Sequence, residues 1–159
     1  EKENISNNNN NNKKGGNGSG SKKYNVLPEL RRGTALLKYG RRGYPHFRQF
    51  NISDDNSKLI WFSTKKNENK SSIHVKTIDD VITGQHTKQF QRIGWVTLKP
   101  ASFSIIYNNK KESLNLVAKS VDEMRMWVES LRLLSTKAKK GENITKLKKV
   151  EVSVDFRDR

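Results

Sequence analysis

The sequence predicts a mainly β fold, with about seven antiparallel strands covered by one C-terminal helix. Between residues 34 and 118, apolar residues recur in short runs with the period of half-buried strands. From residue 120 onward, the spacing of apolar residues changes to that of a helix. The chain has 159 residues, of which only 32% are hydrophobic, so we expect a single domain with polar tails.

Each predicted strand ends at a segment of turn-forming residues. The strands are expected at residues 36–39, 47–52, 59–62, 73–75, 78–82, 103–107 and 113–118. A glycine-bounded loop at residues 40–45 follows the first strand, and two asparagines and two lysines at 108–111 form the turn of the last hairpin. Because open sheet edges favour aggregation, we expect these strands to close into a barrel or a sandwich.

The C-terminal helix is predicted from a capping sequence followed by an apolar stripe. Ser120 stands three residues before Glu123, which is the spacing of a capping box. The stripe then continues along one helical face and ends near Lys137; it consists of Met124, Trp127, Val128, Leu131 and Leu134. A lone amphipathic helix after seven strands is expected to cover one end of the barrel, with Trp127 in the core.

Polar tails are predicted on both sides of a domain that we place at residues 25–137. Residues 1–24 contain six consecutive asparagines and a Gly/Ser-rich run, so we expect a disordered linker. A self-associating polar tract is the alternative for this segment. Residues 138–159 are rich in lysine and are expected to form a basic tail or a linker to a further domain, with a membrane-touching basic segment as the alternative.

The charge of the chain is strongly positive and is concentrated early in the predicted domain. Lys and Arg number 32 against 16 Asp and Glu, which gives a net charge of +16. Residues 31–66 alone contain nine of these bases and two acids. An anionic partner is therefore expected at this part of the fold.

Several classes of site and location are excluded by residue types that are missing. Cysteine is absent, which excludes disulfides and thiol chemistry, and no apolar run is long enough to span a membrane. The histidines at 46, 74 and 86 lack metal-ligand spacing, and Asp54 and Asp55 belong to a turn. We therefore expect a cytoplasmic, non-catalytic protein without a metal or a cofactor.

The order of these elements, with Trp127 in the last helix, resembles a pleckstrin homology (PH) domain over residues 30–137. Residues 36–38, 60–61 and 103–107 are similar to the PH domain of delta-type phosphoinositide-specific phospholipases C. The run from 36–43 to 59–63 is also similar to PH domains of plant proteins that carry regulator-of-chromosome-condensation repeats and a FYVE finger. The resemblance implies seven strands in two near-orthogonal sheets, capped by the C-terminal helix.

The resemblance also implies a site for inositol phospholipid headgroups at the open end of the barrel. In the family, a lysine late in the first strand precedes a basic-x-Arg motif in the second; Lys38 and Arg48 match, while His46 replaces the other base. Gly40 departs from the phospholipase pattern, in which a further base stands there. The resemblance implies contacts from Lys38, Arg48 and Lys66, with His46 and Lys65 as accessory residues. Arg41 and Arg42, next in the loop, could replace the base missing at Gly40 and are included among the expected contacts. Two further accessory residues are expected at the lipid surface, Tyr44 and Lys58, the latter through non-specific attraction to anionic lipid.

The alternation of side chains along the strands supports the same site independently of the resemblance. Lys38 shares a face with Leu36, and Arg48 shares a face with Phe50. A charge on an inward-facing position is costly unless it lies at the rim beside an anion or water. We therefore expect both bases to point into one opening, where phosphate suits them; ordinary solvated strand ends are the alternative.

These observations favour a membrane-targeting module that binds phosphoinositides or inositol phosphates. Tyr44, at the tip of the first loop, is expected to contact the lipid interface, with a simple turn that exposes the tyrosine as the alternative. A PH-like protein-interaction scaffold, with only non-specific affinity for anionic lipid, is the alternative function. Nucleic acid is not an expected partner, because Trp61, Phe103 and Trp127 occur in core-like patterns and not as exposed platforms.

Overall fold

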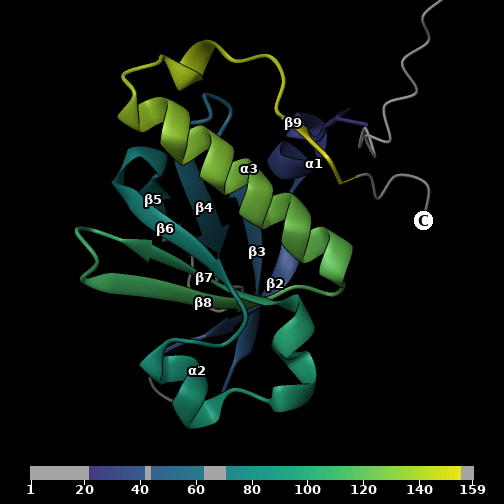
Figure 1. The fold of residues 1–159 in the computed structure, drawn as a ribbon, viewed down its shortest axis with the longest axis vertical. Helices are drawn as coiled ribbons and strands as arrows, with labels where there is room; N and C mark the ends of the chain where they lie inside the picture. Colours follow the sequence, from purple (N-terminus) through teal and green to yellow (C-terminus); the bar gives the residue numbers. More distant parts are fainter. Residues whose placement is uncertain (1–21, 42–43, 63–70, 155–159) are drawn as a thin grey trace, which may run out of the picture.

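A computed structural model describes residues 22–41, 44–62 and 71–154 of the chain (Figure 1). Seven strands form one antiparallel sheet in the order β5–β4–β3–β2–β8–β7–β6, and two further strands form a small second sheet, β1–β9. A long helix, α3 (Val121–Lys139), lies across the main sheet (Figure 1). The predicted fold class, mainly β with a C-terminal helix, is confirmed.

The strands of the main sheet agree with the predicted ones to within two residues at their ends. They are β2 (Thr34–Tyr39), β3 (His46–Ile52), β4 (Lys58–Phe62), β5 (Ser71–His74), β6 (Ile78–Thr83), β7 (Ser102–Tyr107) and β8 (Glu112–Val117). The pairing of β2 with β8 joins the first four strands to the last three. Strands β5 and β6 are the two edges of this order. No strand pairing among the described residues joins these two edges, so backbone hydrogen bonds do not close the sheet into a barrel.

The core lies between the sheet and α3, and it is built from the alternate residues that the sequence pattern indicated. Leu36 on β2 and Phe50 on β3 are buried in the same cluster as the helix residues Trp127 and Leu131. Each fully buried side chain of this size contributes about 1.5–3 kcal/mol to folding. Trp127 has no exposed surface, as expected of a core residue.

The start of α3 carries one half of the predicted capping box. The Ser120 hydroxyl accepts a hydrogen bond from the Glu123 amide at 3.1 Å. The reciprocal bond is not formed through Glu123 Oε1, which is buried without a hydrogen-bond partner. The serine cap alone therefore satisfies one of the free amides at this helix end.

Two short helices between β6 and β7 were not expected from the sequence. They are α2 (Lys88–Ile93) and the 3₁₀-helix η2 (Val96–Ala101), and residues 84–101 that contain them are hereafter the β6–β7 insertion. The insertion buries Phe90 against Tyr39 and Val117, on the face of the sheet opposite to the main core. A helix of six residues is too short to show a clear apolar period, which is why the pattern did not reveal it.

The folded part extends beyond both ends of the interval assigned from sequence. After α3, a 3₁₀-helix η3 (Ile144–Lys146) and strand β9 (Glu151–Val152) pack on the domain, and β9 pairs with β1 (Tyr24–Asn25). Ile144, Val150 and Val152 are buried there. The stretch expected as a solvated basic tail is thus ordered up to residue 154; residues 1–21 and 155–159 lie outside the described residues.

One more short helix, α1 (Leu27–Arg32), and the 3₁₀-helix η1 (Val75–Thr77) complete the described elements. Leu27 and Leu30 of α1 belong to the main core. Within the described ranges, no helix combines the length and the apolar character needed to cross a bilayer.

Candidate ligand-binding cleft

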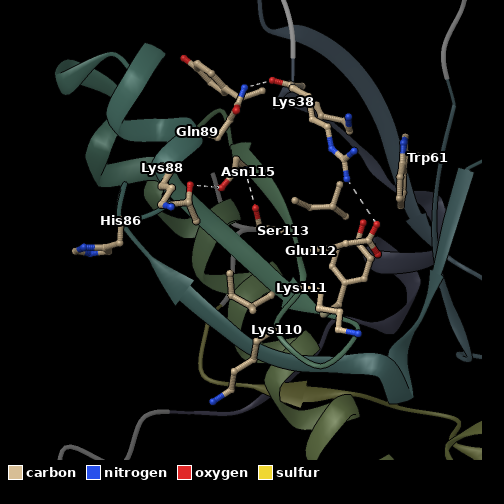
Figure 2. A pocket seen from close by; sticks show the side chains of 17 residues that line it. Lys38, Trp61, His86, Lys88, Gln89, Lys110, Lys111, Glu112, Ser113 and Asn115 are labelled. Atoms are coloured by element: carbon tan, nitrogen blue, oxygen red, sulfur yellow. Dashed lines mark hydrogen bonds and ion pairs between the residues drawn. The ribbon is translucent and has the colours of Figure 1, made fainter.

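A cleft of about 630 Å³ opens beside the C-terminal end of β2 (Figure 2). Its walls come from β2 and the residues after it, from the turn between β7 and β8, and from the start of α2. Among the described residues, five cationic side chains line it: Lys38, Arg41, Lys88, Lys110 and Lys111. It is hereafter the basic cleft.

Lys38 is the half-buried cation of the basic cleft. It lies on β2, opposite His46 on β3 and Leu116 on β8. Burial, together with the nearby charges of Arg48 and Arg41, lowers the pKa of Lys38 below its usual value of 10.5. The ammonium is therefore electrostatically unfavourable in the free protein, and an anion in the cleft would relieve this cost.

Arg48, on the neighbouring strand, adds a second positive charge near Lys38 without being among the described residues that line the cleft. Its Cα pairs with that of Leu36, and its NH1 donates to the Phe47 carbonyl at 3.0 Å. The side chain is half-buried, and its charge acts on Lys38. The structure thus places the charge of Arg48 near Lys38, but Arg48 is not among the described residues that line the basic cleft, and the convergence of both bases in one opening stays a prediction.

Arg41 reaches across the cleft to the opposite strand. Its NH2 lies 3.8 Å from Glu112 Oε1, and 89% of its side chain is exposed. This contact follows from the pairing of β2 with β8, in which Tyr39 faces Asn115. Continuing the antiparallel register past Tyr39 brings the segment after β2 alongside the first residues of β8.

Of the remaining predicted site residues, three lie outside the described residues, two are exposed near the end of β2, and Lys58 begins β4. Arg42, Lys65 and Lys66 lie outside the described residues. His46 is exposed opposite Lys38, and Tyr44 is 85% exposed on the loop that follows β2. Neither His46 nor Tyr44 is among the described residues that line the basic cleft.

Lys58 is not brought to the cleft. It begins β4 beside Ser53, whose hydroxyl accepts from the Lys58 amide at 3.0 Å. The next residue, Leu59, pairs with Ile52, at the far end of β3 from His46. Six steps along a strand correspond to roughly 20 Å. The strand register thus places Lys58 far from Lys38, and its accessory attraction to an anionic surface stays a prediction.

Three lysines of the cleft were missed by sequence reasoning. Lys110 and Lys111 lie in the β7–β8 turn, where Asp79 accepts a hydrogen bond from the Lys110 amide at 2.8 Å. Lys88 begins α2 just after its cap residue Thr87. The turn was recognisable from its asparagines. Its position beside the end of β2, however, depends on the pairing of β8 with β2, and no local sequence pattern predicts that pairing.

The β6–β7 insertion holds the residues after β2 in place. The side-chain amide of Gln89 donates to the Gly40 carbonyl (Figure 2). Arg92 NH2 donates to the Arg41 carbonyl at 2.9 Å. The Thr87 hydroxyl also donates to Asn115 Oδ1 at 2.6 Å. One wall of the basic cleft is thereby tied to the sheet by side-chain hydrogen bonds.

Comparison of the sequence with known proteins points to one family. The sequence profile of the pleckstrin homology domain matches residues 21–136. Inactive phospholipase C-like protein 2 of Mus musculus is 36% identical over 104 residues, which cover 64% of this chain and 9% of that protein. The 1-phosphatidylinositol 4,5-bisphosphate phosphodiesterase eta-2 of Mus musculus is 32% identical over 109 residues, covering 68% of this chain and 7% of that protein. The chain thus spans less than a tenth of the length of either relative.

Solved structures show the same fold at low sequence identity. PLC21 of S. officinalis superimposes with a TM-score of 0.57 at 16% identity, over 72% of this chain and 16% of that one. The C-terminal PH domain of human pleckstrin gives a TM-score of 0.51 at 23% identity, over 72% of this chain and 98% of that one. The predicted resemblance to phospholipase C-type PH domains is confirmed by the profile and by the relatives, and the chain belongs to the pleckstrin homology domain family.

Proposed function

We propose that this domain binds the phosphorylated headgroup of phosphoinositides in the basic cleft and so holds its parent protein at a cytoplasmic membrane surface. The observation that carries the proposal is the half-buried ammonium of Lys38, whose pKa is lowered by burial and by the adjacent cations Arg48 and Arg41. Cations held together at such a cost are typical of a site for a polyanion. The proposed role is non-catalytic and requires no cofactor.

The chemistry of the cleft suits a phosphorylated sugar. Lysine supplies a compact charge, whereas arginine supplies a fork of donors that matches phosphate oxygens. The volume of about 630 Å³ lies within the usual range for small-molecule sites. Arg42, directly after Arg41, and Lys66, in the segment after β4, are proposed as further contacts, with Lys65 and His46 as accessory residues.

The names of two relatives support the class of ligand. One relative is named as a phosphodiesterase of phosphatidylinositol 4,5-bisphosphate, and another as an inactive phospholipase C-like protein. A domain shared by an enzyme of inositol phospholipids and by an inactive homologue fits a role in binding the lipid surface. The exposed ring of Tyr44 is proposed to rest at the interface of that surface.

Vesicle sedimentation tests the proposal. Vesicles with about 5% of a phosphoinositide are compared with phosphatidylserine vesicles of equal surface charge, since each base near an anionic surface adds about 1 kcal/mol without specificity. We expect tighter binding to the phosphoinositide vesicles and about a tenfold loss for Lys38→Ala and for Arg48→Ala. Lys148→Ala removes the same charge from an exposed position after α3 and should change binding less than about twofold. Equal binding to both kinds of vesicle, unchanged by Lys38→Ala, would refute the proposal.

A protein-interaction scaffold is the second candidate, and exposed apolar side chains favour it. Phe47 on β3 is more than 60% exposed, and so are two consecutive residues of the β6–β7 insertion, Trp95 and Val96. Exposed aromatic residues are enriched at protein interfaces. If a soluble inositol phosphate left the amide resonances of β2 and β3 unshifted, while a protein ligand shifted those of Phe47 or Trp95, the scaffold function would be preferred.

A further inference from the structure

The basic cleft also contains a carboxylate in its wall. Glu112, the first residue of β8, is the one acidic side chain among the described residues that line the cleft, against five cations. Figure 2 shows its carboxylate facing the same space as Lys38 and joined by a dashed line to the Arg41 guanidinium. An acid in a site for a polyanion opposes binding through like-charge repulsion, so its presence calls for a physical explanation.

The carboxylate of Glu112 is held in position from two sides. Its Oε1 lies 3.8 Å from Arg41 NH2, and its Oε2 accepts a hydrogen bond from the Asn108 side-chain amide. About a third of the side chain, 35%, remains exposed. Part of its capacity to accept hydrogen bonds is therefore open toward the cleft.

The half-buried side chain of Tyr107, on the strand beside β8, is affected by the same two charges. Tyr107 pairs with Glu112 across the β7–β8 hairpin. Burial raises the pKa of Tyr107, the negative charge of Glu112 raises it further, and Arg41 acts in the opposite direction. The charges of Glu112 and Arg41 thus both lie close enough to Tyr107 to act on it, in opposite directions.

We infer that Glu112 selects among headgroup isomers, because its carboxylate accepts a hydrogen bond from a ring hydroxyl that faces it and repels a phosphate at the same ring position. The inference rests on the proposed function and deepens it, since it states which part of the headgroup is read. An ionised carboxylate only accepts hydrogen bonds, so a hydroxyl is a matched partner and a phosphate is not. The surrounding cations attract every phosphorylated isomer, and Glu112 distinguishes between them.

The ion pair with Arg41 gives this selection a second component. A phosphate that uses Arg41 must share the guanidinium with Glu112 or displace it. The guanidinium fork can serve two oxygens at once, but a phosphate placed there also lies close to the carboxylate. The penalty imposed by Glu112 should therefore be larger for isomers that engage Arg41 and smaller when Arg41 is absent.

Calorimetric titration of Glu112→Gln tests the inference. The glutamine keeps an oxygen that can accept from Asn108 and removes the charge. Wild type and variant are titrated with inositol 1,4,5-trisphosphate, inositol 1,3,4-trisphosphate and inositol 1,3,4,5-tetrakisphosphate. We expect an affinity gain of about tenfold for the isomer that wild type binds most weakly, and no gain for the isomer that it binds most tightly.

Two further variants separate selection from a general change of charge. Glu142→Gln removes an equivalent acid that pairs with Lys137 at 3.2 Å after α3, and it should alter every isomer alike and by less than about twofold. Glu112→Asp keeps the charge but retracts it by one methylene, so it should weaken the discrimination without a uniform gain. In an Arg41→Met background, the effect of Glu112→Gln should shrink.

The outcomes distinguish the inference from the function on which it rests. A uniform gain for all isomers in Glu112→Gln, or no gain for any of them, would overturn the selection role while leaving headgroup binding intact. If wild type bound none of the three isomers and Lys38→Ala changed nothing on vesicles, the proposed function would fail, and the selection role would fail with it.

Discussion

The indole nitrogen of Trp127 donates a hydrogen bond to the hydroxyl of Thr34, with 3.0 Å between Nε1 and Oγ1. The bond joins the buried face of α3 to the first residue of β2. Because β2 also carries Lys38, the helix that covers the core helps to set the position of the strand that supplies the candidate site.

Replacing Thr34 by valine is expected to destabilise the domain without changing the shape of the side chain. The buried indole N–H would lose its partner, which costs about 1–3 kcal/mol of unfolding free energy. Urea denaturation followed by Trp fluorescence measures the loss. Thr34→Ser keeps the hydroxyl and should cost less than Thr34→Val; equal stability of wild type and Thr34→Val would contradict the role of this bond.

Asn56 is expected to hold the segment after α3 against the sheet. Its side-chain amide donates to the carbonyls of Ile144 and Leu147, both at 3.0 Å, and the residue is fully buried with φ at 64°. Asn56→Ala would leave both carbonyls without this donor and place a less tolerant residue in the left-handed region, at a combined cost of about 2–4 kcal/mol. Hydrogen exchange should show the largest loss of protection at residues 144–152.

A glycine at the same position separates the two effects. Asn56→Gly removes the hydrogen bonds but accepts the positive φ without steric cost, so it should be about 1 kcal/mol less destabilising than Asn56→Ala. If both variants left the exchange of Val150 unchanged, Asn56 would not be what holds this segment.

Lys38 is expected to titrate below 10.5 in the folded protein, as followed by NMR of its Cε and Nζ nuclei. Between the folded and the unfolded pKa, the unfolded chain binds more protons, so stability should rise with pH across that window. Below the pKa of Lys38 in the folded protein, the charged ammonium lowers the free energy of unfolding by its full amount. Above pH 10.5 this destabilising effect disappears, because Lys38 is then neutral in both states. Arg48→Gln removes one of the adjacent charges and should raise the pKa; a titration at the usual value in wild type would contradict the burial of this ammonium.

Asp55, in the turn between β3 and β4, is expected to titrate at about 2 instead of 3.8. Hydrogen bonds from the Ser57 hydroxyl, the Ser57 amide and the Ser53 hydroxyl favour its charged form. Its contribution to stability is present above pH 3.8 and is lost as the pH falls through about 2. Carboxyl NMR measures the midpoint, and Ser57→Ala should move it upward; a wild-type midpoint near 3.8 would refute the turn geometry.

Local patterns were sufficient for the strands, the last helix and the inward face of the site. The shared face of Lys38 and Leu36, and that of Arg48 and Phe50, follow from the alternation of side chains along a strand. The cap at Ser120 and the core position of Trp127 follow in the same way from helical spacing. These features depend on neighbours within a few residues of one another, so the sequence alone could determine them.

Contacts between distant segments were decided only by the tertiary structure. Glu112 meets Arg41 because β8 pairs with β2, and Lys58 is excluded from the cleft because of its register with β3. The segment after α3 is ordered because its scattered apolar residues find partners on α1, β1 and α3. Pairing between strands that are not neighbours in sequence is set by the packing of the whole sheet, for which no single stretch of residues carries the signal.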